Sequence, residues 1–240
     1  MILPLGFAPI CYYVTRMKVA VLFDMDGVLI DSLDAHWKSW EISCAERDIP
    51  ITREKYERLF GSSFKHFVGE LAPQMPEEER DGWYADKEKR YRESITHDFP
   101  EMPGASALIR RLKDDGFRIG VASSGPRGNV DLLLAKLAAG ELVEASCSSS
   151  EVTHGKPNPD VFLTCAEMLD TAPHHCIVIE DSLPGLIAAQ AAGMASVALV
   201  GTRTKQELAD ASDWVVDHLD DITPDALRQH LHTKQRNGVS

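Results

Sequence analysis

Two aspartates, Asp24 and Asp26, stand two residues apart directly after the apolar run KVAVLF, and Gly27 follows them. The run is typical of a buried strand, and carboxylates at the end of such a strand need partners because isolated charges are costly to bury. Carboxylates serve proteins as nucleophiles, as general acids and bases, and as ligands of hard metal ions. The segment from 24 to 27 is therefore the first candidate for a chemical site.

The elements that must position these carboxylates follow from the pattern of the whole chain. Short β-branched runs alternate with segments of helical spacing, which is typical of the α/β class with a doubly wound parallel sheet. We predict strands at 18–24, 117–124, 142–149, 175–181 and 195–201, and helices at 105–115, 127–138, 159–169 and 183–192. Ligands of such sheets bind outside the carboxyl ends of the strands, so the loops there should carry the site.

One long interval interrupts the alternation, because no strand is predicted between residues 33 and 100. Helical spacing there predicts four helices, at 34–47, 52–60, 64–71 and 77–95. A crossover needs only one helix, so we interpret the four as an inserted helical cap domain, the alternative being helices packed on a sheet face. The predicted organisation is an N-terminal extension (1–16), a core domain (17–32 and 101–240) and the cap domain (33–100).

The loops after the predicted strands carry carboxylates, hydroxyls and an amine. Besides the two aspartates already named, these residues are Ser123, Ser124, Lys156, Glu180 and Asp181. Four neighbouring carboxylates repel one another unless a cation lies among them, and a set of oxygen ligands without Cys or His favours Mg²⁺. Hydroxyls and an amine can hold a tetrahedral anion. Together these residue types predict Mg²⁺-assisted phosphoryl transfer to a carboxylate.

The segments DMDGVLIDS, ASSG, GKPNPD and VIEDS occur in this order, each at a predicted strand end. They resemble the four motifs of the haloacid dehalogenase-like superfamily, and the resemblance covers about residues 17–219. It implies a Rossmannoid core. The position of the helical insert is similar to that in the subgroup with β-phosphoglucomutase and phosphoglycolate phosphatase. The true dehalogenases of this superfamily lack the second aspartate of the first motif, so Asp26 argues against dehalogenation.

The resemblance also implies roles for individual residues in catalysis and phosphate binding. Asp24 would attack phosphorus and become an aspartyl-phosphate. Asp26 would protonate the leaving oxygen and then activate water against that intermediate. Ser123 and Lys156 would bind the transferring phosphoryl group, and Ser124 would contribute its backbone amide.

The metal site and the base of the cap complete the expected set. Asp181 would bind Mg²⁺ directly, with Glu180 either bound to the ion or one layer further out, and Asp24 and the backbone carbonyl of Asp26 would also reach the ion. His36 lies about one helical turn past Ser32, where β-phosphoglucomutase-like sequences carry a histidine that assists proton handling. We expect His36 to face the site, the alternative being an ordinary interface histidine.

The cap sequence helps to decide between two reactions, hydrolysis of a sugar phosphate and transfer of its phosphoryl group to another position of the sugar, as in a mutase. β-Phosphoglucomutase-like sequences clamp a second phosphate with an arginine and a lysine, at places where Phe64 and Glu93 stand here, although a shift of one residue would restore Lys65 and Arg92. Without that clamp we predict a phosphoric monoester hydrolase, a Mg²⁺-dependent phosphatase of a small phosphorylated metabolite such as a sugar phosphate. The alternatives are a β-phosphoglucomutase-like hexose-phosphate mutase and a binding protein with an idle site.

The composition of the chain argues against several classes of binding partner. A net charge of −12 and the lack of a basic block argue against nucleic acid and anionic membranes as partners. No run of 18 apolar residues predicts a membrane span. Five cysteines without a CxxC pattern indicate a reducing compartment, so we expect a cytoplasmic protein. The acidic surface and the single core favour a monomer, the alternative being a dimer.

Overall fold

The computed structural model describes residues 18–201 and 203–237, so the predicted extension at 1–16 lies outside the described residues. Six parallel strands form one sheet in the order β3-β2-β1-β4-β5-β6. Strand β1 lies near the middle, and its Val21 faces Ile119 of β2 and Ile177 of β4. The strands are β1 Ala20–Phe23, β2 Arg118–Ala122, β3 Ala145–Cys147, β4 Cys176–Glu180, β5 Ala195–Leu199 and β6 Trp214–Val216. The predicted doubly wound parallel sheet is thus confirmed.

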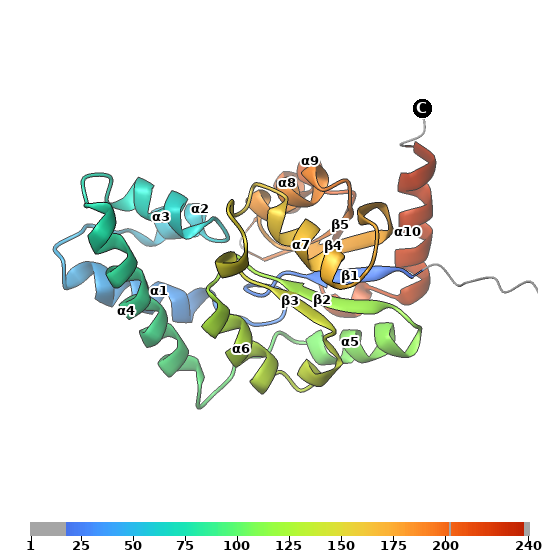
Figure 1. Cartoon of the computed structure of the whole chain (residues 1–240), viewed down its shortest axis with the longest axis horizontal. Helices are drawn as coiled ribbons and strands as arrows, with labels where there is room; N and C mark the ends of the chain where they lie inside the picture. Colours follow the sequence, from blue (N-terminus) through green and yellow to red (C-terminus); the bar gives the residue numbers. More distant parts are fainter. Residues whose placement is uncertain (1–17, 202, 238–240) are drawn as a thin grey trace, which may run out of the picture.

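Helices cover both faces of the sheet (Figure 1) because side chains along each strand alternate between the two faces. In β1, Val21 and Phe23 pack into one apolar cluster with α5, α6 and α10, whereas Ala20 and Leu22 pack into another with α7 and α8. The helices that pack around the sheet are α5 Ala105–Asp114, α6 Arg127–Lys136, α7 Asp160–Met168, α8 Leu183–Ala191, α9 Lys205–Ala211 and α10 Pro224–Asn237. Short 3₁₀ turns occupy Gly140–Leu142, Ser149–Glu151, Pro173–His175 and Leu219–Asp221.

Two parts of the core differ from the sequence prediction. Strand β3 is shorter than the predicted 142–149, because Leu142 ends a 3₁₀ turn and Ser148 opens a capping box for the next one. As the edge strand of the sheet, β3 has hydrogen-bonding partners only on β2. Strand β6 was not predicted, since its three residues are too short for a recognisable pattern.

Four helices form the predicted cap beyond one end of the sheet rather than on either face (Figure 1). They are α1 Leu33–Ala45, α2 Arg53–Leu59, α3 Phe64–Leu71 and α4 Glu77–Ile95. The cap has its own apolar cluster, which is centred on Trp40, Tyr56, Phe67 and Trp83. The residue limits of the predicted domains stay a prediction. Within the part of the chain that the structure describes, no helix combines the length and the apolar character needed to cross a bilayer.

The two segments that connect core and cap lie side by side. Ile30 forms an antiparallel bridge with Glu101, Asp31 N donates to Pro100 O at 2.8 Å, and Met102 N donates to Leu29 O at 3.0 Å. Backbone hydrogen bonds therefore tie the entry and the exit of the cap to each other. This pairing places α1 and α4 directly next to the tip of β1.

Candidate active site

The first candidate carboxylate, Asp24, continues the sheet at the tip of β1. Its backbone N donates to Ile179 O of β4 at 2.9 Å, and its side chain is buried. Oδ1 accepts a hydrogen bond of 2.5 Å from Lys156 Nζ. Burial raises the pKa of Asp24 to about 7, with Glu180 and Asp26 adding to the rise and Lys156 opposing it.

Lys156 lies in the loop between β3 and α7 and is only 1% exposed. Its ammonium donates to Asp24 Oδ1, to Glu180 Oε1 at 2.9 Å and to Ala122 O at 3.3 Å, so each of its three protons has an acceptor. Burial acts to lower the pKa of this amine, but the carboxylates of Asp24 and Glu180 outweigh burial and raise the pKa above its ordinary value. A permanent positive charge therefore lies beside Asp24.

The predicted metal ligands Glu180 and Asp181 differ in the hydrogen bonds that their carboxylate oxygens accept. Glu180 Oε2 accepts from the backbone N of Asp181 and of Ser182, both at 2.6 Å, and Oε1 accepts from Lys156 and from Ser182 Oγ. Asp181 is 2% exposed, and its Oδ1 has no hydrogen-bond partner among the described residues. Burial and the nearby carboxylates raise the pKa of Asp181 well above its usual range. Glu180 is thus held by protein groups, whereas Asp181 has a free buried oxygen.

These carboxylates fit a hard cation. One oxygen each from Asp24, Glu180 and Asp181 lie within 4.8 Å of one another. An orphaned buried oxygen and a set of oxygen donors suit Mg²⁺ better than a soft metal. The side chain of Asp26 is not a member of this cluster, so a contact from Asp26 to the ion through its backbone carbonyl stays a prediction.

Two glycines allow the close packing around this cluster. Gly27 has a φ of +83°, and a Cβ there would lie 2.2 Å from Asp181 Oδ2. A Cβ at Gly185, in the first turn of α8, would lie 1.6 Å from Glu180 Oε1. A larger residue at either place would displace one of the two carboxylates.

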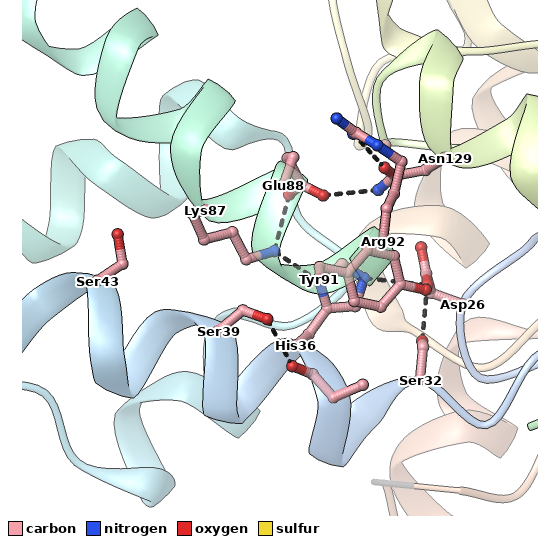
Figure 2. Close-up of polar contacts among 12 residues, drawn as sticks. Asp26, Ser32, His36, Ser39, Ser43, Lys87, Glu88, Tyr91, Arg92 and Asn129 are labelled. Carbon is pink, nitrogen blue, oxygen red and sulfur yellow. Dashed lines mark hydrogen bonds and ion pairs between the residues drawn. The ribbon is translucent and has the colours of Figure 1, made fainter. Parts of the chain in front are cut away.

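Asp26 lies two residues past Asp24 and turns its side chain toward the cap (Figure 2). Its Oδ1 accepts from Ser32 Oγ at 2.6 Å and from Tyr91 OH at 3.3 Å, and it lies 3.2 Å from His36 Nε2. Burial acts to raise the pKa of Asp26, but His36 and Ser32 lower it on balance. The expected proximity of His36 to the site is present in this geometry.

Sequence reasoning missed the residues of α4 that complete this contact. Lys87 Nζ lies 2.5 Å from His36 Nδ1, and the ring of Tyr91 stacks on His36 with centroids 3.6 Å apart. Lys87 and Tyr91 are four residues apart and so share one face of the helix. This spacing was the only feature of the sequence that could have pointed to them as a pair. Glu93 is exposed beside Lys89, and the expected lack of a lysine that clamps a second phosphate stays a prediction.

A pocket lies between cap and core next to Asp24 and Asp26. Its walls include Ser124 and Gly125 from the core and, from the cap, Trp40, Phe60, Phe64, Tyr84, Lys87 and Glu88. Ser123 is buried, and its Oγ accepts a hydrogen bond of 2.9 Å from Gly125 N. Ser124 therefore lines the pocket, while phosphate binding by Ser123 and by the Ser124 amide stays a prediction.

The chain is similar to several known proteins. Residues 21–199 match the family model described as haloacid dehalogenase-like hydrolase. The β-phosphoglucomutase of Bacillus subtilis (strain 168) is 34% identical over 218 residues, which cover 88% of this chain and 94% of that protein. Hexitol phosphatase B of Escherichia coli (strain K12) is 28% identical over 192 residues, which cover 76% of this chain and 83% of that protein.

A solved structure shares the fold. The crystal structure of β-phosphoglucomutase from Clostridium difficile superposes with a TM-score of 0.80 at 24% identity and covers 90% of this chain and 98% of that one. The family model spans more than half of the chain and includes the tips of β1, β2 and β4. The chain therefore belongs to the haloacid dehalogenase-like hydrolases.

Proposed function

We propose that this chain is a Mg²⁺-dependent phosphatase that hydrolyses a small phosphorylated metabolite, with sugar phosphates as the first class to test, through an aspartyl-phosphate on Asp24. The observation that carries the proposal is the setting of Asp24. Its buried carboxylate is bound by Lys156 and lies in one cluster with Asp181, while Asp26 faces the neighbouring pocket. The sugar-phosphate class rests on the relatives, among them a hexitol phosphatase.

In the first half of the reaction, an Asp24 oxygen attacks phosphorus, the bond from phosphorus to the ester oxygen breaks, and Asp26 gives its proton to that oxygen so that the alcohol leaves. Lys156 offsets part of the negative charge that would otherwise repel an incoming phosphate. A Mg²⁺ ion held by Asp24 and Asp181 would supply further positive charge against the phosphoryl oxygens. Water then hydrolyses the aspartyl-phosphate and frees Asp24 for the next turnover.

Asp26 is the proposed general acid and base. A protonated Lys87 has only donors, so His36 Nδ1 must accept from it, and Nε2 then carries the proton that faces Asp26. Lys87 thereby fixes the tautomer of His36, and His36 orients Asp26 toward the pocket. In the second half of the reaction, the ionised Asp26 accepts a proton from the attacking water.

A hexose-phosphate mutase is the second candidate, and the 34% identity with the Bacillus subtilis β-phosphoglucomutase favours it. A mutase must hold a bisphosphate from both ends, so it needs a cation for the second phosphate. Phe64 lines the pocket at the place where the resemblance puts an arginine. This substitution supports hydrolysis over transfer.

The test is phosphate release from a panel of sugar phosphates, phosphoglycolate and nucleotides, with and without Mg²⁺, by the wild type and by Asp24→Asn. We expect release that requires Mg²⁺ and is abolished by the substitution. If no ester releases phosphate but β-glucose 1-phosphate is converted in the presence of a bisphosphate primer, the protein is a mutase and the phosphatase proposal is wrong. Release that survives Asp24→Asn would overturn the proposed nucleophile.

A further inference from the structure

The cap side of the pocket carries no surplus positive charge. Lys87 is the only lysine or arginine among the described residues that line it. Its ammonium donates to Glu88 Oε1 at 2.7 Å, and both side chains are almost fully buried. The positive charge that the cap offers to a substrate is therefore already neutralised by a neighbouring carboxylate.

Glu88 is held in place from the core side as well (Figure 2). Its Oε2 accepts from Asn129 Nδ2 of α6 at 2.6 Å, and Asn129 Oδ1 accepts from Arg92 Nη1 at 2.9 Å. Burial acts to raise the pKa of Glu88, but Lys87, His36 and Asn129 lower it on balance. The pocket wall thus contains a fixed carboxylate that spans the boundary between cap and core.

Much of the rest of the cap wall is aromatic, with His36 and Ser62 as its other polar residues. The rings of Phe64 and Tyr84 stack with centroids 3.9 Å apart, and both line the pocket. Lys65, the next residue after Phe64, is exposed and is not part of the lining. A substrate group that reaches this wall therefore meets ring faces and a carboxylate.

We propose that Glu88 is a specificity-determining residue that makes this enzyme select monophosphates of uncharged alcohols and reject substrates with a second phosphate. The leaving group would rest its apolar face on Phe64 and Tyr84. The inference rests on the proposed phosphatase function and names the substrate class for that site. A second phosphate would have to enter a low-dielectric pocket beside Glu88 without a free cation, and like charges so placed repel strongly.

The experiment compares matched esters that differ by one phosphate, glucose 6-phosphate with glucose 1,6-bisphosphate and fructose 6-phosphate with fructose 1,6-bisphosphate. The wild type should show a kcat/KM about tenfold or more lower for each bisphosphate, which is the effect of roughly 1.4 kcal/mol of repulsion. If these sugars are poor substrates, both members of each pair are compared as inhibitors of p-nitrophenyl phosphate hydrolysis. A bisphosphate that is used or bound as well as its monophosphate overturns the inference but leaves the phosphatase intact.

Two matched substitutions on α4 distinguish the effect of the charge at Glu88 from the effect of removing any negative charge from this helix. Glu88→Gln should raise the ratio of bisphosphate to monophosphate kcat/KM by about tenfold, mainly through a lower KM for the bisphosphate. Glu93→Gln removes an equal charge from an exposed place on the same helix and should leave the ratio unchanged. A Glu88→Gln protein that changes both esters equally would show a merely structural role for Glu88 and overturn the inference.

A second substitution guards against a folding defect in Glu88→Gln. Phe64→Arg adds a cation to the same wall from a partly exposed place, and it should raise the same ratio. If no ester is hydrolysed by the wild type, the proposed function fails, and calorimetric binding of each pair to the protein then decides the selectivity. Tighter binding of the bisphosphates, or no preference between the members of a pair, would contradict it.

Discussion

Asp24 and Asp26 are only two residues apart, yet their surroundings push their pKa values in opposite directions. Asp24 is buried among carboxylates, and its pKa rises to about 7 although Lys156 opposes the rise. Asp26 contacts His36 and Ser32, and its pKa falls below the usual range. Carboxylates with separated pKa values can take different tasks, and the proposed mechanism gives nucleophilic attack to Asp24 and proton transfer to Asp26. Binding of Mg²⁺ near Asp24 would favour its ionised form.

The raised pKa values of Asp24 and Asp181 predict that the metal-free protein loses stability as the pH rises. In the unfolded chain these carboxyl groups lose their protons near pH 4, whereas folded Asp24 keeps its proton up to about pH 7. The folded state thus binds more protons between about pH 4 and 7, and the free energy of unfolding falls with pH across that window. Thermal unfolding in the presence of a chelator, from about pH 5 to about pH 7.5, measures this effect.

The control for this experiment is the Asp24→Asn variant, which cannot titrate at residue 24. We expect its melting temperature to fall less steeply with pH than that of the wild type. Mg²⁺ should raise the wild-type melting temperature most at the upper end of the range, where the carboxylates are ionised. Parallel pH profiles for the two proteins would contradict the assignment.

The turn between β4 and α8 holds two carboxylates, Glu180 and Asp181, at the edge of the sheet. Glu180 is the last residue of β4, and its Oε2 caps the backbone N of Asp181 and Ser182. Ser182 Oγ accepts from Gly185 N and so closes the first turn. Gly185 leaves room for the Glu180 side chain, which in turn directs Lys156 toward Asp24.

Gly185→Ala should therefore reduce both stability and activity. The added methyl group overlaps Glu180, and relieving the overlap should cost about 2 kcal/mol of unfolding free energy. Gly69→Ala in α3 is the matched control, because a Cβ there meets nothing within 4 Å and alanine should stabilise the helix by up to about 1 kcal/mol. Chemical denaturation and phosphate release measure the two effects. Equal stability changes in the two variants would refute the role given to Gly185.

The cap is joined to the core at places far apart in the sequence. The paired connecting segments form one contact, and Arg203, whose Nη2 donates to Arg58 O at 2.8 Å, forms another. A further contact is Asn129, which bonds both Glu88 and Arg92 of α4. Only the connecting segments are covalent, so polar contacts such as those of Arg203 and Asn129 must break if the cap is to open for substrate.

Asn129→Ala should loosen the cap without unfolding the core. The variant removes both bonds from α6 to α4, so we expect faster hydrogen exchange in α4 and a raised KM, with exchange in β1 and β4 unchanged. Gln206→Ala, on exposed α9 of the core, is the control and should behave like the wild type. Unchanged exchange in α4 would mean that Asn129 does not hold the cap.

The sequence alone was sufficient to predict the sheet, the four cap helices and the edge where the site lies. The reason is local: apolar runs of strand length fix where each strand ends, and a parallel sheet brings those ends to one edge. Asp24, Asp26, Lys156 and Asp181 could therefore be named before their distances were known. Strand β6 and both ends of β3 were not correctly predicted, because edge strands this short leave little periodic signal.

The partners of these residues depended on long-range packing. His36 and Lys87 are 51 residues apart, and Glu88 and Asn129 are 41 apart, so no local pattern joins them. Which face of α4 meets the core depends on how the cap packs as a whole, and that decided that Lys87 and Glu88, rather than Glu93, face the site. The residue types at the strand ends could thus be predicted from the sequence alone. The charge of the pocket wall followed only from the tertiary structure, because that wall forms where the cap meets the core.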